Sequence, residues 1–132
     1  MINRKKFEQI RKDIIADRGQ LSLFALFLLE GAEDQWDLVV AAPWLDADQT
    51  AALRYLSKKL TMRLSKRELL EIARIVLIEQ NDPSLKKLLR DTIVEGGEVR
   101  EIENSEFAGL ALRRALILEA KPASAAATRR AS

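Results

Sequence analysis

Three aspartates in the stretch EDQWDLVVAAPWLDAD, residues 33–48, have the types and spacing of a metal site. Asp37 falls inside a predicted strand, and Asp46 and Asp48 follow its end. Metal-dependent phosphodiesterases and nucleases hold a hard cation such as Mg²⁺ with carboxylates of this kind. The usual nuclease arrangement also needs an acid-x-lysine pair on the next strand, and that strand, IARIVLIE, has none. We therefore favour the alternative, in which Asp37 lies at a hairpin rim and Asp46 or Asp48 caps a helix.

The chain lacks the residues that other common catalytic sites require. The chain has no cysteine and no histidine, so thiolate metal sites and Ser-His or Cys-His arrangements are excluded. Ser84-Leu-Lys-Lys87 matches the S-x-x-K pattern, but the companion motifs S-D-N and K-T-G are missing. This favours a protein that is not an enzyme and that needs no cofactor.

A basic segment suggests a different activity. Residues 52–74 hold seven basic side chains against two acids, whereas residues 30–48 hold six acids and no base. A row of cations on an exposed face could contact the backbone of a nucleic acid. The candidates are Arg54, Lys58, Lys59, Arg63, Lys66 and Arg67. In the alternative interpretation these are solvated faces that attract the acidic segment.

Helices should position the basic segment. Apolar residues at three- and four-residue spacing predict helices over residues 4–17 and from the Asp46–Gln49 capping box to about 63. Asn3 can cap the first helix. The spacing of Ser65-Lys-Arg-Glu68 predicts a second capping box and a short helix. Asn81-Asp82-Pro83 predicts the start of another helix that ends near Arg90.

Strands should position the aspartates. Residues 21–30 and 36–45 predict a β-hairpin, with Trp36, Leu38, Val40 and Ala42 on one face. The β-branched residues 72–79 indicate a central strand, and 99–103 a short one. Residues 107–119 fit either a strand or a helix, and we favour the strand.

These elements predict an α+β fold in the order α-β-β-α-α-β-α-β-β. We expect a mostly antiparallel sheet of about five strands, with helices packed on one face. The 132 residues fit one domain over 1–120, followed by a disordered basic tail over 121–132.

Two arginines are candidates for an interface, although an edge position or a helix would account for them without one. If residues 107–119 form a strand, Arg114 lies on the same face as several leucines, next to Arg113. A charge there must be paired, or must meet a partner subunit or a ligand. Residues 21–29 and 110–118 are also apolar on both faces, which would suit a sheet covered by a second subunit.

The sequence has no apolar run long enough to cross a bilayer and no clear signal peptide, so we expect a cytoplasmic protein with no membrane contact. The leading hypothesis is a small non-enzymatic protein that acts through protein–protein contact as a homodimer. The first alternative is a nucleic-acid-binding protein that uses residues 52–74. The second is a metal-dependent phosphodiesterase or nuclease-like enzyme.

Overall fold

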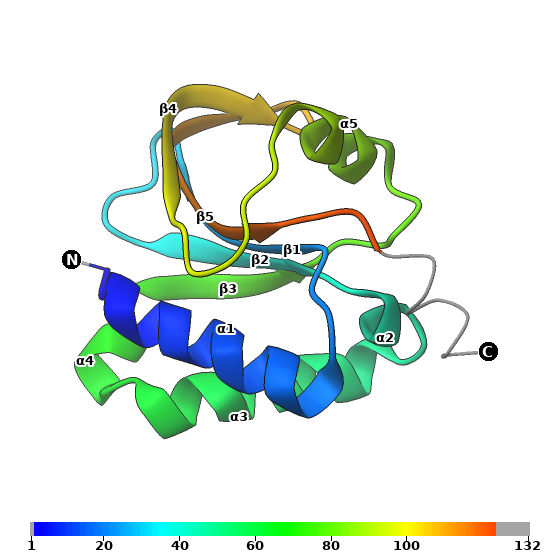
Figure 1. Ribbon diagram of the computed structural model, residues 1–132. Coiled ribbons are helices and arrows are strands. Elements are labelled where there is room, and N and C mark those ends of the chain that lie inside the picture. Colours follow the sequence, from blue (N-terminus) through cyan, green and yellow to red (C-terminus); the bar gives the residue numbers. More distant parts are fainter. Residues whose placement is uncertain (1, 124–132) are drawn as a thin grey trace.

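A single five-stranded sheet organises residues 2–123, the part of the chain that the computed structural model describes (Figure 1). The strands lie in the order β3-β2-β1-β5-β4. The elements are α1 (Arg4–Arg18), β1 (Leu23–Leu29), β2 (Trp36–Ala41), α2 (Pro43–Asp46), α3 (Gln49–Arg63), α4 (Lys66–Leu69), β3 (Ile72–Leu77), α5 (Pro83–Asp91), β4 (Arg100–Phe107) and β5 (Leu110–Ala120). The predicted α+β fold is confirmed, with one short helix, α2, in addition. The expectation that the helices pack on one face of the sheet is wrong, because α5 packs on the other face. The sheet is mixed, because β3 runs parallel to β2 and the other pairs are antiparallel. The predicted tail lies mostly outside the described residues.

Helices α1 and α3 lie side by side against one face of the sheet (Figure 1). Most residues of the apolar stripes predicted from the sequence are buried, although Leu53 on α3 is exposed. Phe7, Ile10 and Ile14 of α1 and Leu56 and Leu60 of α3 all belong to the same core cluster. Burial of these stripes is the main source of stability for the helix layer.

The opposite face is covered by α5 and by the curled β4–β5 hairpin (Figure 1). The pairing of β5 with β1 shifts at two β-bulges, and bulges bend a strand and increase its twist. Leu85 of α5 and Phe107 of β4 are buried in this second cluster. The apolar runs that suggested a covering subunit are therefore mostly buried within the chain itself, with Leu110 as an exposed exception, and they no longer indicate a partner.

Side-chain caps set the starts of α1, α3, α4 and α5. Asn3 accepts a hydrogen bond from the backbone N–H of Lys6, as expected. The predicted capping box of Ser65 and Glu68 is present. The predicted box at Asp46 is wrong: Asp46 ends the one-turn helix α2, and Asp48 caps α3 through the N–H of Ala51.

Strand β3 is an edge strand, so its prediction as a central strand is wrong. Its β-branched residues favour an extended backbone but carry no information about which strands will flank it. The chain returns from α3 and α4 to the outer side of β2, and β4 and β5 then add beyond β1 at the other side. Within residues 2–123, no helix is both long and apolar enough to span a membrane.

Candidate functional site

The six candidate cations divide into groups that point in different directions. Lys59 and Arg63 of α3 turn toward α1 and pair with its aspartates. Arg54 and Lys58 are exposed on the solvent side of α3. Lys66 and Arg67 are exposed on α4. The structure therefore keeps four of the six free of an ion pair within residues 2–123 and neutralises the other two.

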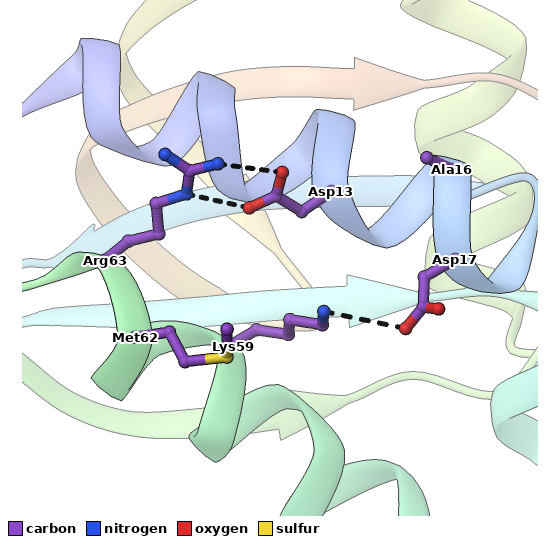
Figure 2. A pocket seen from close by; sticks show the side chains of 6 residues that line it. All are labelled: Asp13, Ala16, Asp17, Lys59, Met62 and Arg63. Carbon is purple, nitrogen blue, oxygen red and sulfur yellow. Dashed lines mark hydrogen bonds and ion pairs between the residues drawn. The ribbon is translucent and has the colours of Figure 1, made fainter.

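The neutralised pairs line a shallow open cleft of about 500 Å³ between α1 and α3, which Figure 2 shows. Arg63 donates to both carboxylate oxygens of Asp13, at 2.8 Å from Nε to Oδ2 and 3.0 Å from Nη2 to Oδ1. Lys59 Nζ lies 3.6 Å from Oδ2 of Asp17. The hydrogen bonds from Arg63 lower the pKa of Asp13, so this carboxylate stays charged and matched near neutral pH.

One end of the cleft holds a stack of aromatic and cationic groups. The Tyr55 hydroxyl donates to Asp17 at 2.7 Å, and Trp44 meets the Tyr55 ring edge-on at 5.8 Å. The Arg18 guanidinium lies 4.4 Å from the centre of the Tyr55 ring. Burial raises the pKa of Tyr55, and the bond to Asp17 raises it further, while the same bond lowers the pKa of Asp17. Tyr55 therefore keeps its proton, and neither group is suited to proton transfer near neutral pH.

The three candidate metal ligands are not brought together. Asp37 lies near the start of β2 and pairs with Arg74 at 3.1 Å. Asp46 and Asp48 follow the other end of β2, where Asp46 accepts from the N–H of Gln80. Among residues 2–123, no group of three or more acidic side chains is placed to hold a metal ion.

The two candidate interface arginines both have partners within the chain. Arg114 pairs with Glu101 at 2.6 Å and lies 5.5 Å from the centre of the Trp36 ring. Arg113 lies at one of the β5 bulges and donates to the backbone oxygen of Glu33. Their positions therefore give no separate indication of an interface.

A buried ion pair that the sequence did not suggest joins α1 to β5. Arg11 and Glu119 are each 6% exposed, and Arg11 Nη1 donates to Glu119 Oε1 at 2.9 Å. Arg11 also donates to Glu8. The available signal was the position of Arg11, four residues after Phe7 and three before Ile14, on the apolar stripe of α1.

An apolar groove runs beside the free edge of β3. It is lined by Leu53, Leu60, Leu69, Ile72 and Ile75, with polar Ser57, Thr61 and Arg74 among them. Leu53 in this groove and Leu70, which follows Leu69 in the sequence, are exposed large apolar side chains. Exposed apolar groups beside an open strand edge are typical of a surface that binds another polypeptide.

Comparison of the chain with models of protein families and with curated proteins found no match.

A network at the start of α4 makes the fold sensitive to acid. Glu68 accepts hydrogen bonds from Lys6 Nζ at 2.6 Å, from the N–H of Ser65 at 2.9 Å and from Asn3 at 3.2 Å. These bonds, that of Lys6 above all, lower the pKa of Glu68 from 4.5 to about 2. A carboxyl whose pKa is lower in the folded state stabilises the fold above its unfolded pKa, and this stability is lost as the pH falls toward its folded pKa.

Glu68→Gln is therefore expected to lower the melting temperature at pH 7 and to lower it progressively less between pH 4.5 and about 2. Thermal unfolding followed by circular dichroism over this pH range measures the difference. The same change at exposed Glu103 is the control and should leave the melting temperature nearly unchanged. A Glu68 deficit that stays constant across the range would contradict the linkage.

Proposed function

We propose that the protein acts through protein–protein contact, and that its partner is a second copy of the chain bound along the free edge of β3. The single observation that supports this most is the open edge itself: within residues 2–123, β3 pairs only with β2. Unpaired N–H and C=O groups at a strand edge are a template for another strand. The proposal keeps the cytoplasmic location expected from the sequence.

The direction of the backbone groups defines which residues would pair. The N–H of Ile78 donates to the oxygen of Val40 on β2. Backbone groups alternate along a strand, so those of Val76 face β2 as well, while those of Ile75 and Leu77 face outward. Two outward residues in each copy are enough for four hydrogen bonds across an antiparallel contact.

The two edge strands of the sheet differ in how many charged side chains they carry, and such charges discourage pairing with another chain. Strand β4, at the far edge, carries three glutamates, and charges on an edge strand oppose association. Strand β3 carries one charge, Arg74, beside the apolar groove. The difference favours β3 as the edge that pairs.

An antiparallel contact centred on Val76 fits these residues best. It places Ile75 opposite Leu77 of the second copy, and Arg74 opposite Ile78, so no like charges face each other. The two copies of Val76 then form a non-hydrogen-bonded pair, whose Cα atoms lie about 4.5 Å apart. That distance lies within the range a disulfide can bridge.

The absence of cysteine makes the contact directly testable. Under mild oxidation Val76→Cys is expected to give a disulfide-linked dimer that disappears on reduction. Ile78→Cys, two residues along the same face, is the matched control, because its two copies would lie more than about 13 Å apart in this register. The readout is non-reducing electrophoresis, together with the mass of the unmodified protein by light scattering.

A dimer in solution with crosslinking at residue 76 and little at residue 78 supports the proposal. Equal crosslinking of both variants would indicate random collision, and a monomer at high concentration would exclude the homodimer. A dimer whose residue 76 does not crosslink would mean that the copies meet elsewhere.

A further inference from the structure

The helix layer concentrates the positive charge of the molecule. Helices α1, α3 and α4 together carry twelve Lys and Arg against four Asp and Glu, a formal charge of +8. The remaining residues of 2–123 carry eight basic and sixteen acidic side chains, a formal charge of −8. The net charge of +2 for the whole chain hides this separation. Such a separation creates a potential strong enough to attract a polyanion to one side of the molecule.

Two cations of α3 lie on its outer surface. Tyr55, Lys59 and Arg63 turn toward α1, as their bonds to its aspartates show. Leu53 and Ser57 lie on the other side of α3, toward β3, and line the apolar groove there. Arg54 and Lys58 lie between these two rows and are exposed to solvent.

The same reasoning places two cations on the outer surface of α1. Asp13 and Asp17 turn toward α3, and Arg11 turns toward β5. Lys5 and Lys12 are exposed between these rows, about 10 Å apart along the helix. The axes of packed helices lie about 8–10 Å apart. The two cations of α1 and the two of α3 therefore form a patch that is about as wide as this distance between the helices.

The acids inside this patch are already neutralised. Asp13 and Asp17 lie between the two rows of cations, where Arg63 pairs with Asp13 and Lys59 with Asp17 (Figure 2). The Tyr55 hydroxyl also donates to Asp17. Within residues 2–123, none of Lys5, Lys12, Arg54 and Lys58 takes part in an ion pair with a carboxylate. They therefore remain available to phosphate groups, and the two acids between them are already paired with Arg63, Lys59 and Tyr55.

We propose that the outer surface of α1 and α3 binds the phosphate backbone of double-stranded nucleic acid through Lys5, Lys12, Arg54 and Lys58. Exposed Lys66 and Arg67 extend the surface at α4. Single strands are bound by stacking of bases on free aromatic rings. Here the Tyr55 ring is covered by Arg18 and Trp44. The proposal does not depend on the β3 contact.

The test is fluorescence anisotropy of a labelled short DNA duplex titrated with the protein at several NaCl concentrations. Four phosphate contacts predict that log K falls with log salt with a slope of about −3.6 for each bound chain. Arg54→Glu/Lys58→Glu should weaken binding at low salt by about tenfold or more and reduce the slope by about 2. Circular dichroism and melting temperature should be unchanged, because both side chains are exposed.

A matched control lies on the other side of the sheet. Lys86 and Arg90 are exposed on α5, also four residues apart, so Lys86→Glu/Arg90→Glu makes the same change in charge. This variant should bind the duplex nearly as well as the unmodified protein. Equal weakening by both variants would mean that net charge alone acts, and would overturn the proposal. The absence of duplex binding at low salt, or tighter binding to a single strand or to phosphatidylserine vesicles, would also overturn it.

Discussion

Replacement of Arg11 by alanine is expected to lower the free energy of unfolding at pH 7 by about 3–5 kcal/mol. Arg11 and Glu119 are both buried, and the substitution leaves the Glu119 carboxylate without its cation. An unpaired buried charge costs far more than the pair itself contributes, because neither water nor a counter-charge can reach it. Small domains are stable by about 5–15 kcal/mol, so the loss is a large part of the total.

The pH dependence distinguishes this cause from a simple loss of packing. Burial raises the pKa of Glu119 even beside Arg11, and removal of Arg11 should raise it further. A carboxyl with a raised folded pKa costs stability above its unfolded pKa, and the cost is relieved as the pH falls through the folded pKa. Urea unfolding should therefore show a smaller deficit for Arg11→Ala at pH 5 than at pH 7.

Two further variants check the argument. Arg11→Ala/Glu119→Ala should lose less stability than the sum of the two single changes, since no unpaired charge remains. Arg63→Ala breaks an exposed pair with Asp13 and should cost much less than Arg11→Ala. Equal costs for Arg11→Ala and Arg63→Ala, with no dependence on pH, would show that burial of the first pair has no special energetic consequence.

Leu26→Ala is expected to lower the free energy of unfolding by about 2–5 kcal/mol. Leu26 lies on β1, the middle strand, opposite Leu38 on β2 and Leu116 on β5. Its exposed fraction is 0%, so the substitution leaves a cavity that strands paired on both sides cannot easily close.

The same substitution at Leu70 is the matched control, because its side chain is 73% exposed. Leu70→Ala should change stability by no more than about 0.5 kcal/mol. Chemical denaturation of both variants, with equal slopes against denaturant, gives the comparison. A cost at Leu26 as small as that at Leu70 would mean that the core can collapse around the missing side chain.

Much of the local structure could be predicted because its causes are local. The cap at Asn3 and the capping box at Ser65 need only a side chain within three residues of a free N–H. The alternation that placed Trp36 and Leu38 on the face opposite Asp37 follows from the period of a strand. The preference for a strand over residues 107–119 was also correct for most of that segment.

The position of β3 and the covering of the second face could not be predicted in this way. Which strand lies at an edge depends on how all the connections cross the sheet. The bulges in β5 arise from its pairing with β1, and no local pattern marks them. The sequence showed apolar runs that needed cover, but not that α5 and the hairpin of the same chain would supply it.

The candidate functional site also has features that the sequence alone determined and features that only the tertiary structure decided. The sequence alone determined that cations gather in residues 52–74, that acids gather before them, and that histidine and cysteine chemistry is impossible. Only the tertiary structure decided that Lys59 and Arg63 are neutralised by α1, that Lys5 and Lys12 join Arg54 and Lys58 on one surface, and that the aspartates lie apart. The physical reason is that electrostatic interactions depend on distance in space. Partners separated by tens of residues along the chain become neighbours only after the helices pack on the sheet.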